Sequence, residues 1–348
     1  MKKYFLSVLP GLISLCVHSQ ALDYSFVVLG CNRVENSDTV GNPSTANVYQ
    51  LKRVFSEVAQ MNPLPAYLFF AGDLIVGYEK DTVRLARELQ SWIKLYKESP
   101  LATTTVKLVA MPGNHESDNK IDDKKVPVVS SERVFVRVMK DYINGKNGPV
   151  ATGLIPGTDS LTTDQSRLTY SFDFKRDHFI ILNTDPVGQD SRIPYHWINK
   201  DIQKAHENGA RHIFAMGHKP AYTTHFKTGL EGLDAYKANR DSFWSCMENN
   251  HAEAMFAAHN HDWDSIQPHK GKTWMIIAGN GGSKLESSWT SAPNSYFGYT
   301  IVNVYKDKRV EVVSMGRDAK METYIAPAAT IPTTERARFL ITSFPETK

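Results

Sequence analysis

Polar residues that can do chemistry stand together where one apolar segment of the chain ends. The stretch KLVAMPGNHE (Lys107–Glu116) carries Asn114, His115 and Glu116 directly after a Pro-Gly pair. Proline and glycine stop a strand and allow a tight turn, and open α/β sheets bind ligands at the carboxyl ends of their strands. An amide oxygen, an imidazole and a carboxylate presented there can bind a metal, hold an anion or move a proton. Taken alone, the stretch fits a polar surface turn equally well.

The same pattern recurs at the ends of other expected strands, and this repetition carries the prediction. The candidate ligands at these ends are Cys31, Asp73, Asn114 with His115, His218, and His259 with His261. A carboxylate, an amide oxygen and several imidazoles form a mixed oxygen and nitrogen set that suits Zn, Mn, Fe or Co. His259 and His261 are two residues apart, so an extended backbone points both to the same face. Together they can reach two neighbouring ions.

Alternating strands and helices are expected to hold these residues. Short apolar runs followed by amphipathic segments predict a strand, helix, strand, helix, strand order, which is typical of a parallel sheet. Further apolar runs predict five more strands, one more helix and a closing hairpin. The expected strands are 24–30, 66–71, 107–111, 169–174, 178–183, 211–216, 253–258 and 273–278, the hairpin pairs 299–304 with 309–315, and the helices are 43–61, 82–97 and 195–208.

The first residues have the composition of an export signal. Two lysines precede an apolar run from Tyr4 to Val17, and Ser19-Gln20-Ala21 supplies small residues where a signal peptidase cuts. We therefore expect residues 1–21 to be a signal peptide and the protein to be secreted or periplasmic. The apolar run is short for a membrane span, and no later stretch is long enough to be one. A lipoprotein signal at Cys16 ranks second, because the bulky Leu15 stands where a small residue is expected.

The remaining chain is expected to form one domain over 22–318. The polar segment 117–168, which contains one helical run, is interpreted as an insertion or cap over the site, and the Thr- and Pro-rich tail 319–348 is expected to add little. Without residues 1–21 the formal charge falls from +3 to +1, and no basic stripe indicates nucleic-acid binding. Two cysteines remain, Cys31 and Cys246, and they can form a disulfide or stay free. The oligomeric state is left open.

Four ordered motifs resemble those of the calcineurin-like metallophosphoesterases. They are Gly72-Asp73, Gly113-Asn114-His115-Glu116, Gly217-His218 and His259-Asn260-His261. Two of the sequence motifs, GNHE at Gly113–Glu116 and HKPAY at His218–Tyr222, look like those of the purple acid phosphatase branch of that family. The resemblance spans about residues 24–317. It implies an α/β fold, a metallophosphoesterase-like sandwich of two mixed β-sheets flanked by α-helices.

The resemblance also implies a site that binds divalent metal ions, two in the family, with Zn, Mn or Fe expected. By position, Asp73 would bridge the two ions. Asn114, His218 and His259 would complete one metal site, and His261 would belong to the other. His115 would protonate the leaving oxygen or steady the phosphate, whereas Glu116 would only support its neighbours.

The first motif departs from the family. The family has Asp-x-His where this chain has Cys31-Asn32-Arg33. Cys31 could replace the aspartate as a thiolate ligand, or it could pair with Cys246 instead. Arg33 could neutralise phosphate charge, or it could form an ordinary surface salt bridge. The tyrosine that colours the purple enzymes would fall at Val76, two positions before Tyr78, so no such colour is expected.

The leading interpretation is a secreted metal-dependent phosphoesterase that hydrolyses a phosphate monoester or diester with a metal-activated water. Its partner would be a phosphorylated small-molecule or macromolecular substrate, chosen by the loops at 34–43, 117–168 and 219–240. The alternative is a non-catalytic or single-metal member of the same fold that binds a phosphate ligand.

Overall fold

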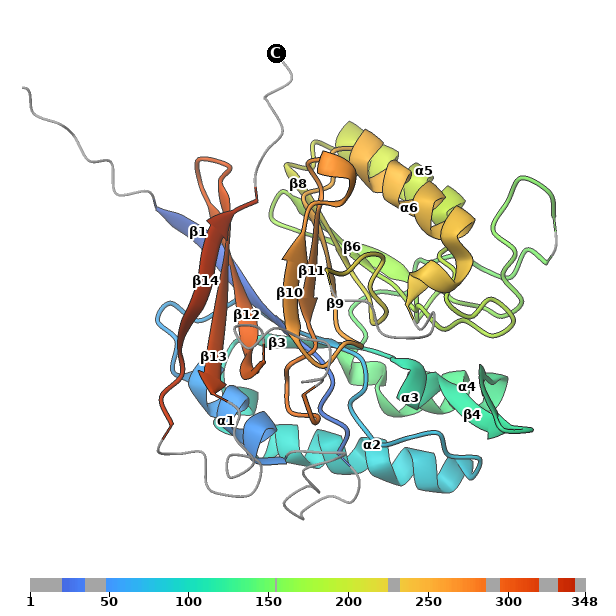
Figure 1. Cartoon of the computed structure of the whole chain (residues 1–348), viewed down its shortest axis with the longest axis horizontal. Coiled ribbons are helices and arrows are strands. Elements are labelled where there is room, and N and C mark those ends of the chain that lie inside the picture. The colour runs from blue at the N-terminus through green and yellow to red at the C-terminus, as the bar shows by residue number, and fades with distance from the viewer. Residues whose placement is uncertain are drawn as a thin grey trace, which may run out of the picture.

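Two mixed β-sheets packed face to face form the centre of the molecule, with helices on both outer sides (Figure 1). The structure is a computed structural model, and it describes residues 21–34, 48–153, 155–224, 232–285, 295–318 and 331–341. Nearly all of the expected signal peptide and of the 34–43 loop lies outside these residues. The architecture confirms the expected α/β sandwich.

The first sheet has the strand order β14-β13-β12-β1-β2-β3. Its strands are β1 (Leu22–Leu29), β2 (Tyr67–Ala71), β3 (Lys107–Met111), β12 (Tyr296–Tyr305), β13 (Val310–Asp318) and β14 (Thr334–Leu340). The strands β1, β2 and β3 are parallel and are joined by α1 (Val48–Ala59) and α2 (Thr82–Lys97). The helix α2 has the predicted bounds, because the side chain of Asp81 accepts a hydrogen bond from Val83 N and caps its start.

The second sheet has the order β10-β11-β9-β8-β7-β6. Its strands are β6 (Tyr170–Phe174), β7 (Asp177–Ile181), β8 (His212–Met216), β9 (Ala254–Ala257), β10 (Trp263–Ile266) and β11 (Trp274–Ala278). The helices α5 (Tyr195–Glu207) and α6 (Lys237–Asn249) cover its outer face. Neither α6 nor β10 was predicted from the sequence.

Aromatic side chains fill the space between the two sheets. Phe26 of β1 contacts Phe179 of β7, Phe214 of β8 and Phe256 of β9, with ring centroids 5.5, 5.3 and 5.8 Å apart. All four rings are fully buried. Because such edge-to-face contacts add to the burial of apolar area, this cluster fixes the two sheets against each other.

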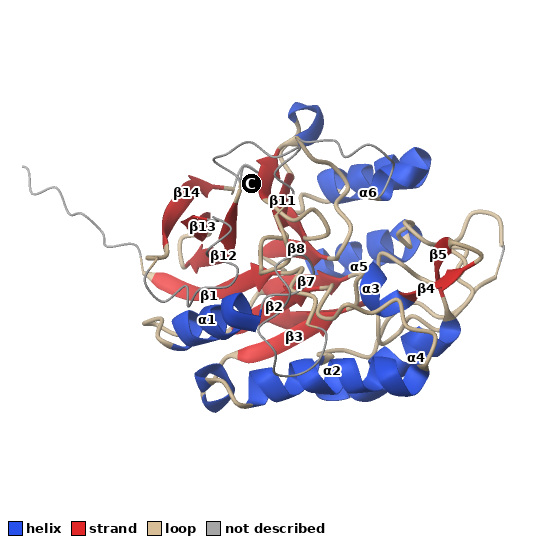
Figure 2. Ribbon diagram, turned by 60° about the horizontal axis from the view of Figure 1, so that its bottom comes forward, coloured by secondary structure: helices blue, strands red, loops and turns tan. Residues whose placement is uncertain are grey.

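The segment after β3, interpreted above as an insertion or cap, contains four regular elements. It forms α3 (Asn114–Ser117), β4 (Asp118–Ile121), β5 (Lys124–Pro127) and α4 (Val129–Val138). Val134 and Phe135 of α4 belong to the main core, and α4 lies along α2 (Figure 2). Only the β4–β5 hairpin stands apart from both large sheets. Four short 3-10 helices complete the described elements, at Pro100–Thr103, Lys140–Tyr142, Leu233–Tyr236 and Pro268–Lys270.

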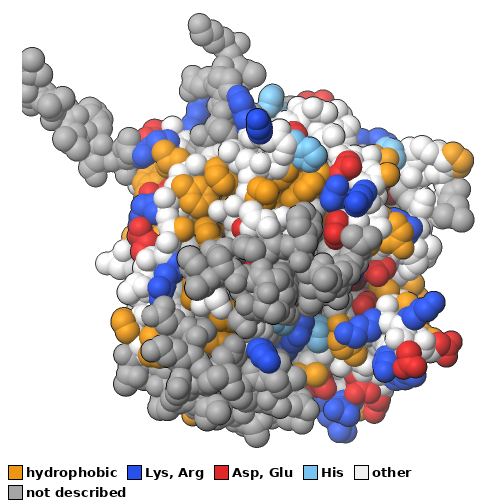
Figure 3. Space-filling view, in the orientation of Figure 1, with side chains coloured by type: hydrophobic (Ala, Val, Ile, Leu, Met, Phe, Trp, Pro, Cys, Tyr) orange, Lys and Arg blue, Asp and Glu red, His pale blue; other side chains and the backbone are white. Residues whose placement is uncertain are grey.

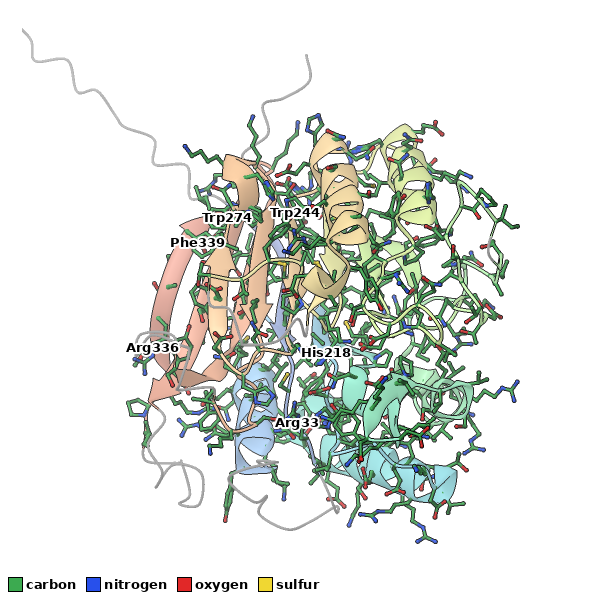
Figure 4. The ribbon with its side chains drawn as sticks, turned by 45° about the vertical axis from the view of Figure 1, so that its right-hand side comes forward. Arg33, His218, Trp244, Trp274, Arg336 and Phe339 are labelled. Carbon is green, nitrogen blue, oxygen red and sulfur yellow. The ribbon has the colours of Figure 1, made fainter. Side chains whose placement is uncertain are left out.

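The C-terminal segment contributes more than the sequence suggested. The strand β14 pairs antiparallel with β13 at the edge of the first sheet. Phe339 of β14 packs on Trp274 of β11 with centroids 4.7 Å apart, and both are labelled in Figure 4. Residues 334–340 therefore belong to the sandwich, and the expectation that the tail adds little is wrong for them.

A buried histidine joins the second sheet to α5. His178 of β7 lies between Asp173 and Asp201, with its ring nitrogens 2.6 and 2.9 Å from their carboxylate oxygens. Burial lowers the pKa of His178, but the two hydrogen-bonded carboxylates outweigh burial and raise it above the usual value.

Charges of both signs are mixed on the described surface. On the face drawn in Figure 3, Lys and Arg side chains lie beside Asp and Glu side chains. Among the described residues, no helix is long and apolar enough to cross a membrane.

Candidate metal centre

The carboxyl ends of strands from both sheets meet at one place. Gly30, after β1, donates its backbone N–H to Ala278 O of β11 at 2.9 Å, which ties one sheet to the other. The backbone N–H of Ala258, after β9, bonds to His218 O, after β8, also at 2.9 Å. His218 and Arg33 are labelled in this region in Figure 4. The candidate ligands that follow five strands, β1, β2, β3, β8 and β9, are thereby brought together.

Four of the predicted ligands converge, and we call Asp73, Asn114, His218 and His259 the histidine site. His218 Nε2 lies 3.0 Å from Asp73 Oδ1 and 2.9 Å from Asn114 Oδ1. His259 Nδ1 lies 3.1 Å from Asn114 Oδ1 and 3.2 Å from His218 Nε2. His218 Nε2 thus lies within 3.2 Å of an oxygen of Asp73, an oxygen of Asn114 and a nitrogen of His259.

Hydrogen bonds on the outer side of these ligands set their orientation. His218 Nδ1 bonds to Ala71 O at 2.8 Å, which leaves Nε2 to face the site. The amide nitrogen of Asn114 donates to the Tyr78 hydroxyl, so its oxygen faces inward. Ligand histidines in metal sites are fixed in this way by a partner on the second nitrogen. The histidine site therefore fits a divalent cation.

The pKa values of the two histidines are shifted in opposite directions. Burial, and then the charge of His218, hold the pKa of His259 well below its usual value, which favours the neutral, metal-binding form. Burial lowers the pKa of His218 too, but the Asp73 carboxylate outweighs burial and raises the net value.

A second cluster contains Cys31, Asp73 and His261, and we call it the cysteine site. Their ligand atoms all lie within 4.8 Å of one another. Cys31 and Cys246 are both free, and Cys31 Sγ accepts the backbone N–H of His259 at 3.1 Å. The disulfide alternative is therefore wrong in this structure. Burial, and then the charge of Asp73, raise the pKa of the Cys31 thiol, whereas the charge of Arg33 opposes that rise.

Arg33 lies against the central carboxylate of both clusters. Its Nη2 and Nε are 2.9 and 3.1 Å from Asp73 Oδ2. The Arg33 side chain is 20% exposed and that of Asp73 is fully buried, so this is no ordinary surface salt bridge. Burial raises the pKa of Asp73, but the charges of His115, His218 and Arg33 outweigh it and hold the pKa well below the usual range.

Glu116 holds the two loops that carry Asp73 and Asn114. Its carboxylate accepts backbone N–H groups from Asp73 at 2.9 Å, Ile75 at 3.0 Å and Gly113 at 2.8 Å. The side chain is buried, and both of its carboxylate oxygens accept hydrogen bonds from backbone N–H groups. It therefore positions ligands and does not supply one, as the sequence suggested.

His115 lies beside Asp73 without belonging to either cluster. Its Nδ1 bonds to Val76 O, and its Nε2 is 3.7 Å from Asp73 Oδ2. Burial lowers the pKa of His115 to about 3, so the ring is neutral. The backbone partner on Nδ1 leaves Nε2 as the atom that can exchange a proton.

Two contacts here were missed from the sequence. The ring of Tyr78 packs on His115 with centroids 4.1 Å apart, and Lys125 Nζ of the β4–β5 hairpin lies 4.0 Å from the centre of the Tyr78 ring. The sequence analysis noted Tyr78 only because it lies two positions after the place of the family's tyrosine. Nothing in the sequence pointed to Lys125. The hairpin thus places a cation at the edge of the site.

The backbone of the site adopts left-handed conformations that non-glycine residues rarely use. The φ angles of Cys31, Arg33, Asp73, Tyr78 and His259 lie between 54° and 66°. Such conformations cluster at functional sites, where the surrounding fold imposes them.

Comparisons with known proteins agree with this geometry. The family model for calcineurin-like phosphoesterases matches residues 25–263, more than half of the chain. A purple acid phosphatase from yellow lupin, Lupinus luteus, has a similar structure, with a TM-score of 0.59 and 13% identity. The match covers 91% of this chain and 53% of the lupin chain, so this chain spans about half of that protein.

A dimetal phosphatase from Danio rerio is also similar, with a TM-score of 0.54 and 11% identity over 92% of this chain and 99% of that chain. At these identities the two structures establish the fold alone. A search of curated protein sequences gives no match. The family model and the ligands at the strand ends together show that the chain belongs to the calcineurin-like phosphoesterase family.

Proposed function

We propose that this protein is an exported metal-dependent phosphoric ester hydrolase that cleaves a phosphate monoester or diester. The observation that carries the proposal is the chain of close contacts that joins Asp73, His218, Asn114 and His259, whose neighbouring ligand atoms lie 2.9–3.2 Å apart. Their oxygen and nitrogen set suits Zn, Mn or Fe, the ions expected from the sequence. A divalent ion held there would polarise a phosphoryl oxygen and lower the pKa of a bound water from about 15.7 toward about 7.

The chain's own residues would then handle the charge and the proton. Arg33 presents a guanidinium beside Asp73, and a guanidinium matches the spacing of phosphate oxygens. Hydrolysis breaks the bond between phosphorus and the leaving oxygen, which then needs a proton. His115 Nε2 is the candidate donor, because a bound phosphate anion would raise the low pKa of His115 and place a proton on that nitrogen. The Tyr78 ring covers one side of His115 and limits its access to water.

The experiment combines metal content with turnover. The purified protein is loaded with Mn, Zn or Fe and assayed on a chromogenic phosphate monoester and on a chromogenic diester. We expect hydrolysis of at least one class, and we expect His259→Ala to lose both metal and activity. A protein that binds no metal and hydrolyses neither ester would contradict the proposal.

A second candidate function is a phosphate-binding protein without catalysis. The Arg33–Asp73 ion pair favours it, because it engages one oxygen of the carboxylate that bridges two ions in the family. This candidate predicts metal binding and binding of inorganic phosphate with no hydrolysis of either ester.

A further inference from the structure

The two oxygens of Asp73 face two different partners. Oδ1 points to the histidine site, 3.0 Å from His218 Nε2. Oδ2 points the other way and receives both Nε and Nη2 of Arg33. A carboxylate that bridges two cations has this arrangement, and here one of the two cations belongs to the chain.

Arg33 is held in this position from both ends. Its backbone N–H donates to Asp73 O at 3.0 Å, and the neighbouring Asn32 N–H donates to the same oxygen at 2.8 Å. Its side chain returns to the carboxylate of the same residue. The left-handed backbone of Arg33, with φ 57°, makes this return possible. The guanidinium is therefore fixed by the fold and does not swing in from the surface.

The cysteine site does not fit a metal ion while Arg33 is in place. An ion bound to Asp73 Oδ2 at about 2.1 Å would lie within about 5 Å of the Arg33 nitrogens that bind the same oxygen. A dipositive ion there would meet a fixed positive charge with Asp73 as the only carboxylate in the cluster.

Resting on the function proposed above, we propose that the Arg33 guanidinium takes the place of one of the family's two metal ions. The chain then binds a single divalent ion, at the histidine site, and Asp73 links that ion to Arg33. Within the described part of the chain, the hydrogen bonds of the Arg33 guanidinium come from Nε and Nη2 and leave Nη1 free, and the side chain is partly exposed. The guanidinium can therefore bind a phosphoryl oxygen on the side away from Asp73, as the missing ion would.

Metal stoichiometry tests the proposal without relying on activity. The full-length protein is stripped of metal, dialysed against excess Mn²⁺ and analysed for manganese per chain. We expect one ion and the uncoupled electron paramagnetic resonance spectrum of isolated Mn²⁺. Two ions with a spin-coupled spectrum would overturn this inference and leave the phosphoesterase proposal standing. No bound ion would overturn the proposed function and, with it, this inference.

Variants of Arg33 test the cause of the stoichiometry. Arg33→His removes the fixed charge and offers an imidazole, so we expect a second Mn²⁺ to bind and the spectrum to become coupled. Arg33→Lys is the matched control, because it keeps the charge and should keep one ion. If Arg33→His does not fold, the double variant Cys31→Asp/Arg33→His, which restores the family motif, takes its place. One ion in both the single and the double variant would overturn the proposal.

Ligand variants locate the single ion. The variant His259→Ala should lose the ion, whereas His261→Ala should retain it. The two variants are matched, because each removes one imidazole and the two positions are only two residues apart. The opposite result would place the ion in the cysteine site and overturn the inference.

Discussion

Gly113 offers a steric test of the histidine site. This residue precedes Asn114 and has a φ of −109°, which any residue can adopt, so a substitution there acts through space alone. A Cβ at Gly113 would overlap Asp73 Oδ1 and lie 2.6 Å from Asp73 N and 2.9 Å from His218 Cε1. Ordinary contacts begin at 3.4 Å, so these atoms must move apart by about 0.5–1.0 Å.

That displacement is large for metal ligands. Metal–ligand distances vary by only about 0.2 Å between sites that bind the same ion. Even mutations of the residues that hydrogen-bond to the ligands lower the affinity for the metal by about 10–100-fold. We therefore expect Gly113→Ala to weaken Mn²⁺ binding by about 100-fold or more. Overpacking a buried site also costs about 1–3 kcal/mol of unfolding free energy.

Gly217→Ala is the matched control. Gly217 precedes His218, and its Cβ would meet only Thr184 and Leu182, at 3.1 Å or more, so no metal ligand has to move. Titration calorimetry with Mn²⁺ and thermal unfolding measure the two effects separately. If Gly113→Ala bound Mn²⁺ as tightly as Gly217→Ala, the two ligands would not act at the positions the structure gives them.

Three further predictions concern other parts of the molecule. His115→Ala should reduce turnover by roughly 10²–10⁴, the range for a general acid, with unchanged metal content; loss of metal would show that His115 is a ligand instead. His178 has a raised pKa in the folded protein, so protonated His178 stabilises the fold. Its contribution to the free energy of unfolding is complete below about pH 6.5 and is lost as the pH rises through the pKa of His178 in the folded protein. The unfolding temperature should fall over that range, and His178→Gln should flatten the profile; an equal slope in both proteins would refute this. N-terminal sequencing of the exported protein should begin near Leu22, where β1 starts, and a retained Met1 in a cytosolic pool would contradict export.

The sequence predicted elements well where local and tertiary preferences agree. The helix α2 was predicted close to its observed bounds because its apolar face is regular, and the Asp81 cap seen in the structure agrees with that start. The strand β14 was missed because three of the seven residues of its sequence, TERARFL, are charged and its side chains are largely exposed at the edge of a sheet. The helix α6 was missed because its first turns are polar and its buried side chains, such as Trp244, lie near its end.

The candidate site shows the same division. Ligands at strand ends could be predicted, since parallel strands bring their carboxyl ends to one edge. The ion pair of Arg33 with Asp73 could not, because it joins residues 40 positions apart through left-handed backbone conformations. The spacing of residues in the sequence does not indicate such backbone angles. The sequence therefore could not decide whether Arg33 binds phosphate or forms a salt bridge.

The left-handed backbone at the site has a consequence for engineering this protein. Each non-glycine residue held in that conformation costs of order 1–3 kcal/mol, and glycine adopts it without that cost. At the fully buried Asp73 this gain is offset, because removing one partner of a buried ion pair costs about 3–5 kcal/mol. A library screened for heat resistance alone would therefore enrich glycine at the partly exposed Arg33 and Tyr78, which have this geometry. Such clones would have lost the guanidinium beside Asp73 or the ring beside His115, so any such screen has to select for function at the same time.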